Sequence, residues 1–297
     1  MNYTNRHNLP PALARLLELP ERPVEPDVVH VTDLAGSMRI AILKRRHAHE
    51  TIKDVADMFW MFNGNVVHSL LAKTEGDDEF VEEKVTHRLG KYTLSGTADK
   101  HKGVGIVDWK YTSVWAYVFG GYDEWEPQLN VYNYMWLKEM GFSAEYLEDW
   151  LVLRDWSESR AETDSTYPKV FFQKLSQPIW TSDVTEKYLE TRLATFDLCM
   201  NMADDELPPC TSNQMWQRDE SYAVMKKGNK KASKLFKVEG NKNAEEEAKA
   251  HVEIQKKPGD YEVEYRPGDR VRCRRNACGV ASWCNLCPKK EESDGKG

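Results

Sequence analysis

The sequence lacks several features that would define whole classes of protein. No hydrophobic run approaches the roughly 20 residues that a membrane-spanning helix needs. The polar and then proline-rich start has no apolar signal region. No Gly-Lys-Ser/Thr phosphate loop occurs, and Gly103-Val104-Gly105 lacks the third glycine of a dinucleotide-binding fingerprint. We therefore expect a cytoplasmic protein without a membrane partner, and we set a nucleotide enzyme aside.

An excess of positive charge is also missing. The chain of 297 residues has 41 Lys and Arg against 48 Asp and Glu, so its formal net charge is −7. This balance argues against a generally basic nucleic-acid coat. It leaves room for a local basic groove, because an enzyme needs positive charge only where phosphate binds. The length suffices for a full α/β core with an accessory lobe.

Cysteine is scarce until the last third of the chain. The first of the six cysteines is Cys199, which we expect to be a core residue, and five follow residue 205. The last four follow a C-x4-C-x5-C-x2-C spacing: Cys273, Cys278, Cys284 and Cys287. Clustering of this kind in a cytosolic protein points to metal rather than to disulfides. Four thiolates can bind Zn²⁺ or an iron–sulfur cluster.

What the sequence does contain is a charged hairpin. Residues 95–99 lead through a polar turn into residues 105–110, which predicts two paired strands. Asp108 and Lys110 are two apart on the second strand, so their side chains project to one face, roughly 6–7 Å apart. An ammonium beside a carboxylate suits metal-assisted cleavage of phosphodiesters.

The register of this hairpin decides whether a second carboxylate joins the first. If the turn centres on Lys102-Gly103, Asp99 lies opposite Ile106 and diagonal to Asp108, about 7–8 Å away between Cα atoms. Two carboxylates this close can share a divalent cation such as Mg²⁺. A slip of one residue would send Asp99 to the other face.

Polar residues on the flanking segments extend the pattern. The apolar segment upstream predicts a helix, in which His68 follows Gly64 by one turn. A second helix is predicted downstream, with Pro127 in its first turn. Gln128 and Tyr132 lie four apart on that helix and therefore share a face. Taken alone, such a histidine is more often a packed core residue, and such a pair carries little information.

Over roughly residues 60–140, the sequence resembles the RecB-like branch of the PD-(D/E)XK nuclease superfamily. The resemblance lies in the order of five motifs: Gly-x-x-x-His, a Glu-bearing strand, Gly-x-x-Asp, Asp-x-Lys and Gln-x-x-x-Tyr. A less specific similarity extends along most of the chain to bacteriophage members. The resemblance implies an α/β, restriction-endonuclease-like core, with a mixed central sheet flanked by helices. It also implies a Mg²⁺- or Mn²⁺-dependent exonuclease acting on DNA during phage recombination, replication or repair, in the host cytoplasm.

The resemblance further implies roles for single residues. The metal ligands would be His68, Asp99, Asp108, the main-chain carbonyl of Trp109 and Glu83. Glu82 is the alternative to Glu83, but only Glu83 shares a face with Val85. Lys110 would assist the nucleophile, and the pair Gln128 and Tyr132 would orient the site and the DNA. Ala98 stands where the superfamily name has proline, which leaves the ligands intact.

Many RecB-like nucleases carry a [4Fe–4S] cluster bound by one distant cysteine and three C-terminal ones. Cys210 would be the distant ligand here, although in the usual members this cysteine precedes the nuclease core. Cys273, Cys278 and Cys284 would complete the set and leave Cys287 spare. Arg275 stands where the usual C-x2-C-x5-C spacing would begin. An iron–sulfur cluster and Zn²⁺ therefore both stay open as cofactors.

Composition shifts after residue 205 and sets apart a small β-rich accessory region (206–297). The resemblance implies a nuclease core at 60–205, which follows an N-terminal arm and helical region (1–59). In the accessory region, residues 222–225 and 232–236 predict paired short strands. The link between them holds four lysines: Lys226, Lys227, Lys230 and Lys231. These lysines suit a finger that grips DNA phosphates, and a solvated turn is the alternative. The Lys44-Arg45-Arg46 run is either a solvated face or a second phosphate track.

Two hypotheses about function follow. The first is the metal-dependent deoxyribonuclease described above. The second is a metal-stapled nucleic-acid-binding subunit that is inactive alone and works with a helicase, a recombinase or a single-strand-binding protein. The sequence leaves open DNA against RNA, single against double strand, and exonuclease against endonuclease action.

Overall fold

The computed structural model describes residues 2–19, 23–50, 52–71, 80–101, 104–229, 231–274 and 277–288, and for 80–82, 99–101 and 274 the backbone alone. The chain divides into two compact units. Unit 1 comprises Met1–Cys210 together with Trp283–Asn285, and unit 2 comprises Thr211–Ser282 with Leu286–Gly297.

Unit 1 is built on a mixed sheet, which has six strands within the described residues. Its order is β2-β5-β6-β7-β8, and β4 pairs with β5. The strands are β2 (Val28–His30), β4 (Phe80–Leu89), β5 (Tyr92–His101), β6 (Gly105–Thr112), β7 (Tyr146–Leu153) and β8 (Phe172–Gln177). The pairs β2–β5 and β6–β7 are parallel, and the others are antiparallel. A mixed α/β architecture, as the sequence predicted, is therefore confirmed.

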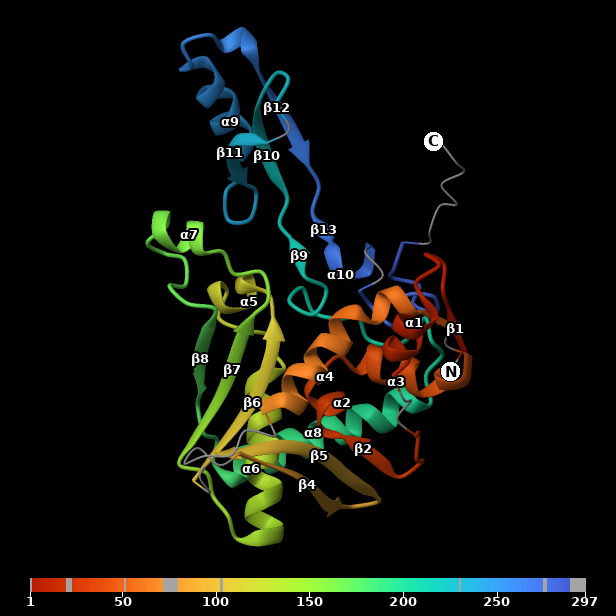
Figure 1. Cartoon of the computed structure of the whole chain (residues 1–297). Coiled ribbons are helices and arrows are strands. Elements are labelled where there is room, and N and C mark those ends of the chain that lie inside the picture. Colours follow the sequence, from red (N-terminus) through yellow and green to blue (C-terminus); the bar gives the residue numbers. More distant parts are fainter. Residues whose placement is uncertain are drawn as a thin grey trace. The chain divides into compact units, whose positions relative to one another are not determined.

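Helices pack around this sheet (Figure 1). The helix α6 (Trp125–Met140) packs against β4, β6 and β7. It ends at Gly141, whose left-handed conformation (φ 67°) provides the C-cap. The remaining helices of unit 1 are α1 (Pro11–Leu17), α2 (Val31–Ala35), α3 (Met38–Arg46), α4 (Phe59–Leu71), α5 (Val114–Val118), α7 (Glu158–Thr163) and α8 (Ser182–Met200). Outside the main sheet, β1 (Asn2–Thr4) pairs in parallel with β3 (Ile52–Asp54).

The core forms where β6, β7 and α6 meet, because all three bring apolar side chains to the same layer. Ile106 on β6, Leu151 on β7 and Trp136 on α6 are fully buried. Strands paired on both sides and covered by helices read as apolar runs rather than as strict alternation. A charged side chain within such a run is consequently costly unless it is paired.

The register of the β5–β6 hairpin differs from the prediction by one residue. Asp99 pairs with Val107, not with Ile106, and His101 pairs with Gly105. The connection 102–104 thus has three residues where the turn signal suggested two, and an odd connection shifts every partner by one. The predicted diagonal between Asp99 and Asp108 is therefore wrong. The side chain of Asp99 lies outside the described side chains, so its role as a ligand stays a prediction.

Unit 2, taken by itself, contains a three-stranded antiparallel sheet of order β11-β10-β12 against which α9 packs. Its elements are β9 (Gln217–Arg218), β10 (Ser221–Lys226), β11 (Ala232–Lys237), α9 (Ala244–Glu253), β12 (Tyr261–Arg266), β13 (Asp269–Arg270) and α10 (Val271–Arg274). Tyr222 pairs with Phe236, which confirms the predicted hairpin. Lys226 ends β10, Lys227 and Lys231 lie in the connection, and Lys230 is outside the described residues.

No helix in the described part of the chain is long and apolar enough to cross a membrane.

Candidate active site

Four residues that the sequence singled out meet in one hydrogen-bonded network on unit 1. Lys110 Nζ lies 2.5 Å from Asp108 Oδ2 and donates to Gln128 Oε1 at 3.2 Å. Gln128 Nε2 donates to the same Asp108 oxygen at 2.6 Å and contacts the Tyr132 hydroxyl at 3.4 Å. Strand β6 supplies the ion pair and α6 supplies the amide and the phenol. The packing of this helix on this strand is what builds the network.

The glycine of the Gly-x-x-Asp pattern has a steric reason. A Cβ atom on Gly96 would overlap Cε1 of Tyr132 and lie 3.1 Å from Cγ2 of Val31. The tyrosine ring therefore occupies the space where a side chain on β5 would be. Only glycine at this position lets Tyr132 reach the network from α6.

A third charged group in this region escaped the sequence analysis. Asp149 on β7 pairs in parallel register with Asp108 on β6 and is fully buried. Gln177 Nε2 donates to its Oδ2 at 2.6 Å. Its Oδ1 lies 4.0 Å from Lys110 Nζ and has no hydrogen-bond partner among the described residues. An aspartate between Leu147 and Leu151, which share its face of the strand, is the signal that could have revealed it.

The electrostatics of the site follow from this crowding. Burial raises the pKa of Asp149 to about 7; Lys110 opposes the rise and Asp108 adds to it. Burial alone would lower the pKa of Lys110, but the carboxylates of Asp108 and Asp149 outweigh it, and the pKa is raised. Lys110 is therefore a protonated donor at neutral pH, not a base.

The helix α4 brings a further predicted residue to β6. His68 Nε2 lies 2.8 Å from the main-chain oxygen of Trp109. Because a carbonyl only accepts, Nε2 carries the proton in this contact. Two of the predicted ligands, contributed by different elements, thus face each other at one point of the strand.

The two candidate glutamates lie on β4, opposite the end of β5 that carries Asp99. Glu82 pairs with Asp99, and Glu83 pairs with Ala98. Val85, which shares a face with Glu83, is buried. Glu83 is partly buried, and the side chain of Glu82 lies outside the described side chains. The choice of Glu83 as a ligand stays a prediction.

The donors near β6 suit a hard divalent cation. Within the described residues, no group of three or more His, Cys, Asp and Glu side chains is arranged to bind a metal ion, and Asp99 is outside that comparison. The available donors are the Asp108 carboxylate, the Trp109 carbonyl and the His68 imidazole. Oxygen-rich sets of this kind fit Mg²⁺ or Mn²⁺ in donor chemistry.

The predicted cysteine ligands divide between the two units. Cys210 and Cys284 belong to unit 1, whereas Cys273, Cys278 and Cys287 belong to unit 2. In unit 1, Ser37 Oγ lies 3.1 Å from Cys210 Sγ, and Arg39 Nη1 donates to Cys284 Sγ at 3.7 Å. Each of these two sulfurs thus has a polar partner on or beside α3. Cys199 on α8 is buried, as predicted for a core residue.

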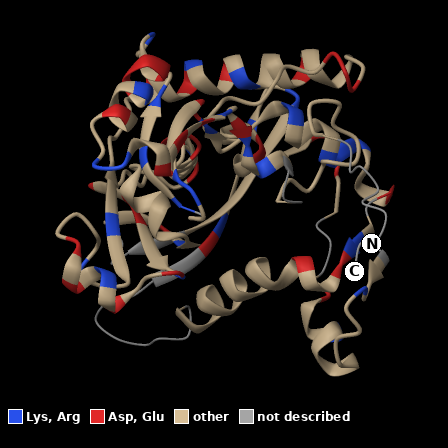
Figure 2. Ribbon diagram, turned by 90° about the horizontal axis from the view of Figure 1, so that it is seen from above, with Lys and Arg blue, Asp and Glu red and all other residues tan. Residues whose placement is uncertain are grey.

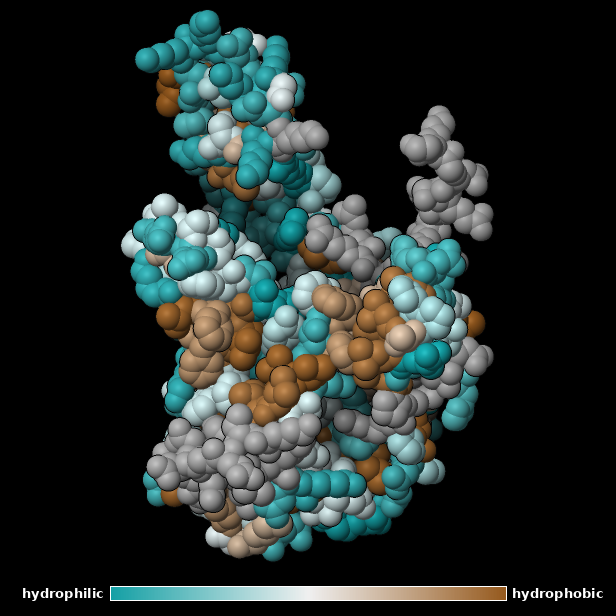
Figure 3. Space-filling view, in the orientation of Figure 1, coloured by the Kyte–Doolittle hydropathy of each residue, from teal (hydrophilic) through white to brown (hydrophobic). Residues whose placement is uncertain are grey.

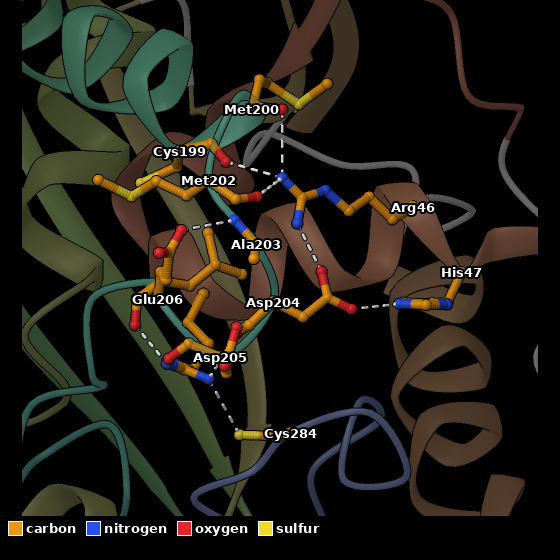
Figure 4. Close-up of polar contacts among 12 residues, drawn as sticks. Arg46, His47, Cys199, Met200, Met202, Ala203, Asp204, Asp205, Glu206 and Cys284 are labelled. Atoms are coloured by element: carbon orange, nitrogen blue, oxygen red, sulfur yellow. Dashed lines mark hydrogen bonds and ion pairs between the residues drawn. The ribbon is translucent and has the colours of Figure 1, made fainter.

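Two residues of the basic run on α3, Arg45 and Arg46, have a structural role instead of either predicted one, whereas Lys44 is exposed, as predicted for a solvated face. Arg46 donates to the carbonyls of Cys199, Met200 and Met202 at 2.9, 3.1 and 2.6 Å and pairs with Asp204 at 2.5 Å (Figure 4). Arg45 binds main-chain oxygens in the same way. Neither arginine is a solvated residue or part of a phosphate track. Their partners lie far away in sequence, so the run itself could not reveal them.

Arg39 and His47 complete this structure, which we call the Asp204 clamp and define as Arg39, Arg46, His47 and Asp204. His47 Nε2 lies 2.8 Å from Asp204 Oδ2. Arg39 is almost fully buried and donates to the carbonyls of Asp204, Asp205, Leu207 and Pro208 and to Asn285 Oδ1. The clamp holds the chain that follows α8 against α3, on the approach to Cys210.

Comparisons with known proteins leave the chain without a family. No family model matches it, and no curated protein matches it. Among solved structures, the chain is similar to one described as "Crystal structure of SSO0001", with a TM-score of 0.38 and 16% identity. The similarity covers 61% of this chain and 83% of that one. A likeness this weak identifies neither a shared fold nor a function.

Proposed function

We propose that the chain is a divalent-metal-dependent deoxyribonuclease with a restriction-endonuclease-like core, acting as an exonuclease in phage DNA recombination, replication or repair. The observation that carries the proposal is the network of Asp108, Lys110, Gln128 and Tyr132. Two motifs that are weak in isolation, Asp-x-Lys and Gln-x-x-x-Tyr, join in one charged site, and a structural role alone does not require that combination.

The residues around β6 divide the work. Asp108, His68, the Trp109 carbonyl and, from the resemblance, Asp99 and Glu83 would hold Mg²⁺ or Mn²⁺, which supplies a Lewis acid for phosphodiester hydrolysis when bound. Lys110 is held by Asp108 and Gln128 and stays protonated. Its ammonium is suited to orienting the attacking water and to stabilising negative charge on the phosphate.

The cysteines are proposed to bind a [4Fe–4S] cluster, with Zn²⁺ as the alternative. Supporting this, the sulfurs of Cys210 and Cys284 each have a polar neighbour, Ser37 and Arg39. Hydrogen bonds of this kind stabilise thiolates and are typical of the outer shell of metal centres. Cys273 and Cys278 are included on their spacing alone, and Cys287 would be a ligand only in the C-x4-C-x5-C-x2-C set of a Zn²⁺ site.

Partners and location rest on the resemblance and on composition. DNA would be the substrate, and the hairpin lysines of unit 2 (Lys226, Lys227, Lys230 and Lys231) would bind its backbone. A helicase, a recombinase or a single-strand-binding protein would be the protein partner, in the host cytoplasm.

The test is cleavage of end-labelled single- and double-stranded DNA with Mg²⁺ or Mn²⁺. Lys110→Ala and Asp108→Ala should each lose on the order of a hundred- to a thousandfold in rate, with DNA binding retained. Lys174→Ala is the matched control. Lys174 lies on β8 of the same sheet and stacks over the ring of Trp150, and the variant should cleave DNA as wild type does. Wild-type protein that binds DNA but cleaves none of it would overturn the proposal in favour of a partner-dependent binding subunit.

A further inference from the structure

A second feature of unit 1 is the helix α4, whose apolar side chains are only partly covered. Within the described residues, α4 has no buried residue, and Phe59, Trp60 and Met61 are about half exposed. The helix carries no charged residue, and Figure 2 shows its ribbon in one uncharged colour up to the grey segment that follows. Figure 3 shows hydrophobic side chains gathered over α4 and α5. An exposed apolar patch of this kind usually marks a binding surface.

The short helix α5 adds a pair of stacked rings to this face. Trp115 and Phe119 lie 5.9 Å apart between ring centroids with an interplanar angle of 25°, and Phe119 is 78% exposed. The helix is fixed from beneath, because Val114 is buried and its amide donates to Asp155 Oδ1 at 2.7 Å. These exposed rings therefore stand on a firm base.

Two arginines interleave with the exposed rings. The guanidinium carbon of Arg154 lies 4.5 Å from the centre of the Trp60 ring, and that of Arg160 lies 5.2 Å from the centre of the Trp115 ring. Arg160 has a distant ion pair with Asp164, at 3.9 Å. Arg154 has no carboxylate within ion-pair distance in the described part of the chain. We call Phe59, Trp60, Met61, Trp115, Phe119, Arg154 and Arg160 the aromatic–arginine surface.

This surface borders the candidate active site through the backbone. The amide of Arg154 donates to the carbonyl of Thr112 at 2.9 Å, and Thr112 follows Lys110 by two residues on β6. On the same helix as Trp60, His68 reaches the Trp109 carbonyl. An extended ligand bound on this surface would thus end next to the Asp108–Lys110 pair.

We propose that the aromatic–arginine surface binds unpaired nucleotides, with bases stacking on Trp60 and on the Trp115–Phe119 pair and phosphates pairing with Arg154 and Arg160. The proposal rests on the proposed nuclease function and names its substrate class as a single-stranded end. Bases within a duplex already stack on each other and cannot offer their faces to a protein ring. Exposed rings alternating with cations suit the alternating bases and phosphates of a single strand.

The experiment measures binding of fluorescein-labelled oligo(dT) and of a duplex of equal length to the full chain, with Ca²⁺ in place of Mg²⁺ so that cleavage does not intervene. We expect Trp60→Ala, Phe119→Ala and Arg154→Gln each to weaken oligo(dT) binding by on the order of tenfold, with smaller effects on the duplex. Oligo(dT) should also quench tryptophan fluorescence less in Trp60→Ala. Leu198→Ala on α8 and Arg88→Gln on β4, both exposed, are the controls and should bind as wild type does.

Unchanged oligo(dT) binding in a folded Trp60→Ala/Phe119→Ala double variant would overturn the inference. So would a double variant that alters only self-association, since the surface would then join two copies of the chain. Cleavage measured alongside separates the two proposals. A wild type that cannot cleave, yet binds single strands through this surface, overturns the nuclease and supports the surface.

Discussion

Unit 1 contains two partly buried charged clusters that are satisfied in opposite ways. In the Asp204 clamp, the cations face main-chain carbonyls and one carboxylate, so most donors of Arg39 and Arg46 are used. In the candidate active site, the carboxylates of Asp108 and Asp149 face a single ammonium, Lys110, and Asp149 Oδ1 lacks a donor. The clamp is saturated and holds the fold. The candidate active site has two carboxylates for one ammonium, and a buried carboxylate oxygen without a donor costs stability.

Breaking the saturated cluster should have the largest effect on stability. Arg39→Met removes the donors that satisfy several buried carbonyls and leaves those oxygens without partners. We expect a loss of about 3–5 kcal/mol in the free energy of unfolding, measured by urea denaturation. Arg88→Met, at an exposed arginine, is the control and should change it little. A loss below about 1 kcal/mol would mean that the clamp does not hold the fold.

Removing charge from the unsaturated cluster should do the reverse. The folded pKa of Asp149, about 7, lies above its value of 3.8 in the unfolded chain. Between these two values the folded state holds the proton more tightly, so this group makes wild type lose stability as the pH rises from 4 to 7. Asp149→Asn keeps an acceptor for Gln177 and should be more stable than wild type by about 1–3 kcal/mol at pH 8, and equally stable at pH 4.

The pH series itself is the control for this prediction, since a mere packing effect would be the same at both ends. An advantage of Asn that does not grow with pH would show that Asp149 is ionised in the folded protein. The missing donor at Asp149 would then cost the folded state little, and the two clusters would differ less in their effect on stability than their contacts suggest.

His47 offers the smallest effect, and its contribution also falls as the pH rises, but over a higher pH range than that of Asp149. Burial lowers its pKa, but Asp204 and Glu50 outweigh burial and raise it above 6.5. The stabilisation is therefore full below pH 6.5 and is lost as the pH rises through the folded pKa. His47→Gln should cost about 1 kcal/mol at pH 5.5 and less at pH 9, measured by thermal unfolding. A cost that is constant with pH would assign His47 a packing role through its stacking on Trp283.

The parts of the site that sequence could predict are those governed by local periodicity. Asp108 and Lys110 share a face because they are two apart on a strand, and Gln128 and Tyr132 do so because they are four apart on a helix. The meeting of the two pairs came from the family resemblance and was not a consequence of spacing. The paired strands β5 and β6 and the helices α4 and α6 followed from apolar runs and their punctuation, whereas the strand order of the sheet was not predicted.

The parts that sequence missed depend on distances between elements. The register of β5 and β6 hinges on a single extra residue in their connection, which turn composition does not reveal. Asp149 belongs to the candidate site only because β7 pairs in parallel with β6, which places it beside Asp108. Arg45 and Arg46 looked like a surface patch because their carbonyl partners, unlike charged partners, leave no trace in side-chain composition.

The contact between Gly96 and Tyr132 makes one unit of two stretches that seem separate in the sequence. Because the phenol ring occupies the place of a side chain on β5, neither position can change freely while the other stays. A methyl group at position 96 becomes tolerable only with a smaller residue at position 132, and that residue would forfeit the hydroxyl near Gln128. Selection from a library randomised at both positions would therefore return linked pairs, and the route from one pair to another would pass through an impaired intermediate.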